Sequence, residues 1–104
     1  MTVQFNNAYL EQLYLGEVPK GKPKYSPKII EKFIKKVDQL KIVDNAEELL
    51  KFSSLRFEKL KGNKDHLYSI RVNDQYRIEF EMNNTVLKLA DLVIIEELSK
   101  HYEK

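Results

Sequence analysis

Two arginines in the second half of the chain give the first indication of chemistry. Arg71 and Arg77 lie in two short segments in which apolar and polar residues alternate. The guanidinium group is a planar fork of N–H donors that suits phosphate and other oxyanions. The two side chains could therefore hold a phosphate. They could equally form surface ion pairs with Glu79 or Glu81, each contributing about 0–1 kcal/mol, and the sequence leaves both interpretations open.

The register of these two segments decides whether the arginines meet. Residues 68–72 and 76–82 fit neighbouring antiparallel strands whose apolar residues must share one face. Opposed residues of an antiparallel pair lie on the same face of the sheet. A three-residue connection or a bulge satisfies this condition, and it places Arg71 opposite Arg77 on the other face. Opposed guanidinium groups repel each other, so we expect a carboxylate or a bound phosphate beside them.

Imidazole groups are scarce in this chain. It has two histidines, His66 and His101, and no cysteine. A structural zinc site normally needs more such ligands, so we expect neither a metal nor another cofactor. With an ordinary pKa of about 6.5, His101 is a candidate for proton transfer at neutral pH. His66 follows a lysine-rich stretch and fits a solvent-exposed loop.

Periodic patterns predict the elements that must position these residues. Residues 2–5 fit a short strand, and residues 9–14 have the apolar spacing of a helix. Residues 86–95 are mostly apolar, as in a strand that is covered on both faces. The expected fold class is α+β, with an N-terminal strand and two to three helices packed on one face of a small antiparallel sheet.

Two further helix starts are marked by capping residues. Ser26 suits an N-cap and Pro27 the first helical position, and the apolar stripe of residues 29–40 continues this helix. Asp44, followed three residues later by Glu47, resembles a capping box that opens a short third helix.

Length and composition fit one small domain over residues 1–104, of which 42% are hydrophobic. The longest uncharged apolar run has four residues, so we expect no membrane span. The N-terminus lacks the features of a signal peptide, which predicts a cytoplasmic protein. Residues 20–64 carry thirteen Lys or Arg against six Asp or Glu. This net charge of +7 could attract polyanions or simply keep the surface soluble.

Several motifs together resemble a known toxin superfamily. They read RFEKLKG at 56–62, YSIRV at 68–72, QYRI at 75–78 and LSKHY at 98–102. Their order and spacing resemble the RelE/ParE toxins, and within them the HigB group of plasmid-maintenance killer proteins. The resemblance implies helices on one face of an antiparallel sheet and a functional site on the other, concave face.

The same resemblance implies an activity. Toxins of this kind in type II toxin–antitoxin systems are endoribonucleases that cleave mRNA in the ribosomal A site. The 2′-hydroxyl of the RNA attacks the adjacent phosphate, with no metal or other cofactor. The chemistry needs a base for the 2′-proton, cations for the crowded phosphate and an acid for the leaving 5′-oxygen.

Positions within the motifs carry the implied roles. Glu58 is the candidate base, Lys61 is expected to contact the phosphate, and Arg77 is expected to stabilise the charge of the transition state. His101 is the favoured general acid, and Tyr102 would stack on a base or share the proton transfer. Further contacts to RNA are expected from four basic residues: Arg56, Lys59, Lys64 and Arg71.

The end of the chain departs from the family pattern. Residues 96–100 separate the last predicted strand from His101, and the interval from Arg77 is longer than in many HigB relatives. This extra length could form a longer strand or a short helical turn. The acid assignment requires that His101 reach the sheet face.

The resemblance also implies partners. These are an antitoxin, expected to be a HigA-like helix-turn-helix protein, together with the ribosome and mRNA. Two alternative functions stay open: a ParE-like protein that poisons DNA gyrase without being an enzyme, and an inactive homologue that only binds its antitoxin. Codon preference and oligomeric state do not follow from the sequence.

Overall fold

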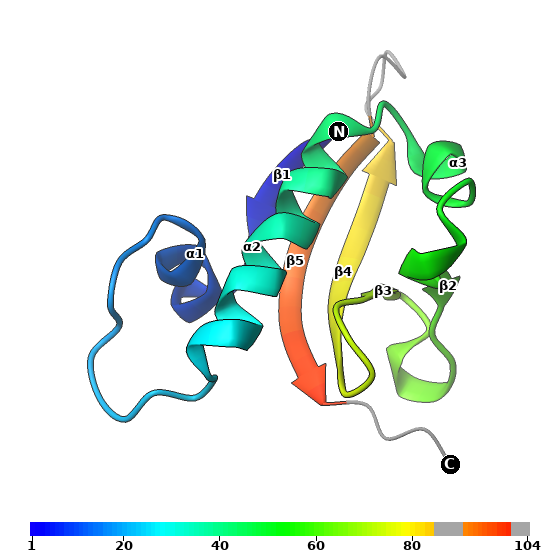
Figure 1. Ribbon diagram of the computed structural model, residues 1–104. Helices are drawn as coiled ribbons and strands as arrows, with labels where there is room; N and C mark the ends of the chain where they lie inside the picture. Colours follow the sequence, from blue (N-terminus) through cyan, green and yellow to red (C-terminus); the bar gives the residue numbers. More distant parts are fainter. Residues whose placement is uncertain (85–90, 101–104) are drawn as a thin grey trace.

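The computed structural model describes residues 1–84 and 91–100, which contain three α-helices, two short 3-10 helices and five strands (Figure 1). In chain order these elements are β1 (Thr2–Phe5), α1 (Ala8–Tyr14), α2 (Pro27–Ile42), α3 (Ala46–Leu49), η1 (Ser53–Leu55), β2 (Glu58–Lys59), η2 (Gly62–Lys64), β3 (Tyr68–Arg71), β4 (Tyr76–Asn84) and β5 (Asp91–Lys100). The strands form one sheet in the order β1-β5-β4-β3-β2. The α+β class is therefore confirmed.

The sheet is mixed, not antiparallel throughout as the sequence pattern suggested. Strand β1 pairs with β5 in parallel, from Thr2 opposite Leu92 to Phe5 opposite Ile95. The helices carry the chain away from β1, and β5 then returns between β1 and β4 in the direction of β1. Within β5, Val93 and Ile95 are fully buried in the core, whereas Leu92 and Ile94, which alternate with them, are half-buried. The expectation that this strand is covered on both faces is therefore met only in part. Residues 86–90 of the predicted last strand lie outside the described ranges.

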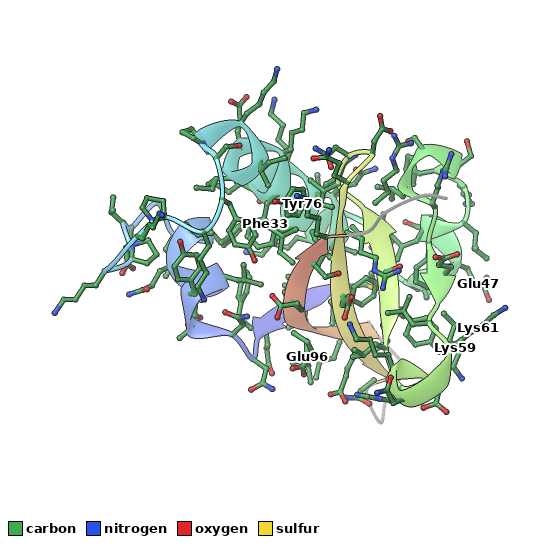
Figure 2. All side chains as sticks on the ribbon, turned by 90° about the horizontal axis from the view of Figure 1, so that it is seen from below. Phe33, Glu47, Lys59, Lys61, Tyr76 and Glu96 are labelled. Atoms are coloured by element: carbon green, nitrogen blue, oxygen red, sulfur yellow. The ribbon has the colours of Figure 1, made fainter. Side chains whose placement is uncertain are left out.

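Helix α2 forms the centre of the layer that covers one face of the sheet (Figure 1). Ser26 caps it by accepting a hydrogen bond from the backbone N–H of Ile29 at 3.3 Å, and Pro27 occupies the first turn as predicted. Phe33, Val37 and Leu40 are fully buried, and Figure 2 shows Phe33 directed toward the sheet. The sheet residues in this core are Ile70, Val72, Ile78, Phe80, Val93, Ile95 and Leu98.

Helix α1 is capped by Asn7, whose side chain accepts from the backbone N–H of Leu10 at 3.1 Å. The loop after α1 is tied to the sheet by Tyr25, which donates to the carbonyl oxygen of Leu98 at 2.8 Å. Burial, assisted by the negative charge of Glu97, raises the pKa of Tyr25 to about 12, so its hydroxyl stays a donor. None of the helices in the described ranges has the length and apolar character needed to cross a membrane.

The cap of α3 differs by one residue from the sequence prediction. Asn45, not Asp44, is the N-cap, and its side chain accepts from the backbone N–H of Glu48 at 3.2 Å. Glu48, not Glu47, is the glutamate that reaches back, and its carboxylate accepts from the backbone N–H of Asp44, the residue before the N-cap, at 3.1 Å. The pattern in the sequence fits both alignments, and with Asn45 as the cap Leu49 is fully buried in the core.

This assignment predicts different costs for two adjacent substitutions. Asn45→Ala should lower the free energy of unfolding by about 1 kcal/mol, because it removes a capping hydrogen bond. Asp44→Ala should change that free energy by less than about 0.5 kcal/mol, because the Asp44 side chain is exposed and its backbone N–H is retained. Urea unfolding of both variants measures this difference. If Asp44→Ala lowers the free energy of unfolding more than Asn45→Ala does, the assignment of Asn45 as the N-cap is wrong.

Candidate active site on the outer face of the sheet

The register of β3 and β4 agrees with the register predicted from the alternation of apolar and polar residues. Arg71 lies opposite Arg77, two residues beyond the pair Ser69 and Glu79. These four residues share the outer face, defined as the face of the sheet opposite the α2 layer. Asn73 closes the turn, because its side chain accepts from the backbone N–H groups of residues 75 and 76 at 2.9 and 2.8 Å. The fold thus brings the two arginines together.

Glu79 is the buried centre of this face, with a relative exposure of 1%. Its carboxylate accepts from Lys64 Nζ at 3.0 and 3.2 Å and from Arg77 Nε at 3.2 Å. The Ser99 hydroxyl donates to it at 2.6 Å. The ion-pair interpretation therefore holds for Arg77 and Glu79. This pair does not lie exposed on the surface, however, because Lys64 and Ser99 help to cover the Glu79 carboxylate.

The charge state of Glu79 follows from these contacts. Burial alone would raise its pKa, since a carboxylate loses water there. Hydrogen bonds from Ser99 and Lys64, with the positive charges of Lys64 and Arg77, outweigh burial and hold the pKa of Glu79 below its usual value. Glu79 is thus ionised at neutral pH and anchors both cations.

A β-bulge in β5 supplies the Ser99 contact. Phe80 lies opposite Ile95 whereas Glu79 lies opposite Glu97, so Glu96 has no opposed residue in β4. This one-residue shift places Ser99 opposite Arg77 and sends Leu98 into the core. The extra length noted in the sequence is therefore a longer, bulged strand through Lys100, not a helical turn.

Two adjoining open pockets occupy the region between β2, η2 and β4. The first, of about 560 Å³, is lined by Arg56, Glu58, Ser69, Arg71, Asn73, Asp74, Tyr76 and Arg77. The second, of about 500 Å³, is lined by Glu58, Lys59, Leu60, Lys61, Lys64 and Arg77. Glu58 and Arg77 border both pockets. They therefore lie where the two candidate binding spaces meet.

The cations around these pockets are held in different ways. Arg71 forms an ion pair with Asp74, so both opposed arginines have a carboxylate partner. Arg56 adopts a left-handed backbone conformation with φ of 45°, uncommon outside glycine, where the chain turns from η1 toward β2. Figure 2 shows Lys59 and Lys61 at the β2 side of the molecule, away from α1, and both are exposed.

Comparison with known proteins identifies the family. Residues 3–92 match the family described as the RelE-like toxin HigB of type II toxin–antitoxin systems. The chain belongs to this family of HigB-like toxins. The resemblance of its motifs to the HigB group is thereby confirmed. None of the curated proteins matches the sequence.

Solved structures support the fold of this HigB-like toxin. A YoeB/ParE toxin from Agrobacterium tumefaciens has a TM-score of 0.55 and 12% sequence identity, and the alignment covers 98% of this chain and all of that one. The YoeB-YefM complex from Staphylococcus aureus gives a TM-score of 0.53 and 21% identity, with 98% of each chain covered. At these identities, the comparisons establish a shared fold.

Two residues assigned from the motifs lie outside the described part of the HigB-like toxin. These are His101 and Tyr102, which also follow the range matched by the family. The described chain ends with Lys100, which lies opposite Tyr76. His66 is exposed, as predicted. Within residues 1–84 and 91–100, no group of three or more His, Cys, Asp or Glu is placed to hold a metal ion.

Sequence reasoning missed the structural importance of Glu79 and Ser99. The alternation that places Arg77 on the outer face places Glu79 there as well, but it carries no information about what covers Glu79. One signal was available: Glu79 lies between Ile78 and Phe80 in the middle of a long strand, where strands are usually covered. Ser99 could not be found, because its position depends on the bulge at Glu96.

Proposed function

We propose that this HigB-like toxin is a metal-independent endoribonuclease that cleaves mRNA on the ribosome by attack of the 2′-hydroxyl on the adjacent phosphate. One observation carries the proposal: a carboxylate, Glu58, and an anchored guanidinium, Arg77, border two pockets whose other charged residues are mainly cationic. A base beside a phosphate-binding cluster is the minimum arrangement for this reaction.

The proposed roles follow the position of each side chain. Glu58 is exposed on β2, so its carboxylate is accessible to a 2′-hydroxyl and acts as the base. Arg77 is half-buried, and its Nε contact with Glu79 orients the guanidinium group at the pocket wall. An oriented donor stabilises the transition-state phosphate more effectively than a mobile one, because it needs no reorganisation during the reaction.

The surrounding cations would hold the RNA backbone. Lys61 contacts the scissile phosphate, and Arg71 contacts a neighbouring phosphate after leaving Asp74. Additional backbone contacts come from three residues that line the pockets: Arg56, Lys59 and Lys64. Of these, Lys64 contributes mainly through its position over Glu79, since that ion pair occupies its ammonium group.

The proposed acid is His101, with Tyr102 stacking on a base or sharing the proton transfer. Both follow directly in sequence after Lys100, at the end of the strand that carries Ser99. An imidazole near its ordinary pKa of about 6.5 can protonate a leaving 5′-oxygen at neutral pH.

The proposal includes protein partners. As a type II toxin, the protein would be held inactive by an antitoxin, which we take to be a HigA-like helix-turn-helix protein. The structural neighbour from Staphylococcus aureus is itself described as a YoeB-YefM complex. The active toxin would act in the cytoplasm, where mRNA is bound to ribosomes.

The test is expression of wild type and Lys61→Ala under tight control, followed by mapping of mRNA 5′ ends. We expect codon-phased cuts with wild type, and cuts about tenfold slower with Lys61→Ala, because one phosphate contact is lost. Lys61 is exposed at the start of η2, so the substitution should leave the fold intact.

Other outcomes identify the alternatives. Growth arrest with intact mRNA and an induced DNA-damage response would show that the protein is a gyrase poison and not a nuclease. Absence of both toxicity and cuts would indicate an inactive, antitoxin-binding protein. Equal cutting by the wild type and Lys61→Ala would remove Lys61 from the proposed site.

A further inference from the structure

A third open pocket adjoins the first one at the β3–β4 turn. It has a volume of about 560 Å³ and is bordered on one side by Lys32 and Lys36 of α2 and on the other by Arg71. Arg71, Asn73 and Asp74 line both this pocket and the first one. The two spaces therefore meet at the turn, and Arg71 stands between them.

The two lysines are placed as a pair. Lys32 and Lys36 are four residues apart on α2, so they lie on one face of the helix, one turn from each other. Within the described residues, neither forms an ion pair with a carboxylate, whereas nearby Lys35 pairs with Glu31 at 3.3 Å. The pocket thus presents ammonium groups beside a guanidinium group.

The carboxylate in this pocket is Asp74, which forms the ion pair with Arg71. Its side chain is 84% exposed, so the pair is accessible to an incoming anion. A phosphate can take the place of Asp74 on Arg71, because exposed ion pairs hold their partners weakly. Asp74 would then turn to solvent.

We propose that the pocket at Lys32 and Lys36 is a second phosphate subsite for single-stranded RNA, reached from the candidate active site past Arg71. This inference rests on the proposed function, because it extends the RNA-binding path of the same site. RNA binds such a surface through its phosphates and releases counterions, so its affinity falls as salt concentration rises. The path would continue from the outer face around the β3–β4 turn to α2, because residues of both elements line this pocket.

The experiment measures binding alone. A fluorescent twelve-nucleotide RNA with 2′-O-methyl groups serves as the probe, because it has no 2′-hydroxyl to react. We expect Lys32→Gln combined with Lys36→Gln to weaken binding about five- to tenfold at low salt. The slope of log affinity against log salt should become shallower by about 1.4, since each phosphate contact on a single strand contributes about 0.7.

The matched control removes two lysines elsewhere. Lys20 and Lys22 are exposed in the loop between α1 and α2, which lies on the far side of the molecule from β2 and η2 (Figure 1). Lys20→Gln with Lys22→Gln has the same net charge as the test variant and should retain affinity within about twofold. Equal weakening by both double variants would overturn the subsite and leave only a non-specific charge effect.

A second variant acts in the opposite direction. Asp74→Asn removes the carboxylate that competes with phosphate for Arg71, so it should tighten binding about two- to threefold. Unchanged or weaker binding would refute the exchange at Arg71. The nuclease proposal is tested separately: if it is wrong, the expression experiment gives no mRNA cuts. The binding result does not depend on cleavage, because the probe RNA cannot react.

Discussion

Arg77→Lys is expected to slow cleavage of mRNA on the ribosome about a hundredfold. Lysine keeps the positive charge and can still reach Glu79, but it loses the planar fork that addresses two phosphate oxygens. Arg77→Ala should slow the reaction about a hundred- to thousandfold, as expected for loss of a transition-state donor. Single-turnover cleavage on ribosomes with a defined mRNA gives these rates.

The matched control for Arg77 is its opposed neighbour, Arg71. Arg71→Lys should slow cleavage about tenfold or less, because Arg71 is paired with Asp74 at the edge of the pocket. Circular dichroism and urea unfolding establish that each variant is folded. If Arg77→Lys cleaves at the wild-type rate, the guanidinium has no special role and the proposed mechanism fails.

Glu79→Gln should lower the free energy of unfolding by about 2–3 kcal/mol at pH 7. The amide retains the size of the side chain, but it loses the charge that holds Lys64 and Arg77. We also expect cleavage to fall about tenfold through kcat with little change in KM, because Arg77 remains but is no longer oriented. Urea unfolding and ribosome cleavage assays measure the two effects.

The effect of Glu79→Gln on stability should depend on pH in a defined direction. The pKa of Glu79 is lowered from 4.5 in the folded protein, so its contribution is fully present above pH 4.5. The contribution is lost as the pH falls through the lowered folded value, and the difference between wild type and variant should then shrink. A difference that stays constant from pH 7 to pH 3 would show that the carboxylate's charge does not matter.

Glu81→Gln is the control for this series. Glu81 lies two residues from Glu79 on the same strand, and it is less buried. Its substitution should change the free energy of unfolding by less than about 0.5 kcal/mol. A loss as large as that of Glu79→Gln would mean that the network around Arg77 is not what stabilises this part of the sheet.

The sequence by itself determined the local elements and the register of one pair of adjacent strands. Ser26 and Pro27 mark the start of α2 because capping and the fixed φ of proline act within one turn. The opposition of Arg71 and Arg77 followed from alternation alone, since a shift of one residue would have exposed the apolar set. Such features depend on residues a few positions apart or on a single turn.

Only the tertiary structure decided the environment of the site. Glu79 is buried by Lys64, fifteen residues earlier, and by Ser99, twenty residues later, which a bulge brings into register. The parallel pairing of β1 with β5 likewise joins the two ends of the described chain. These contacts depend on how distant segments pack together, and alternation within one segment carries no information about its distant neighbours.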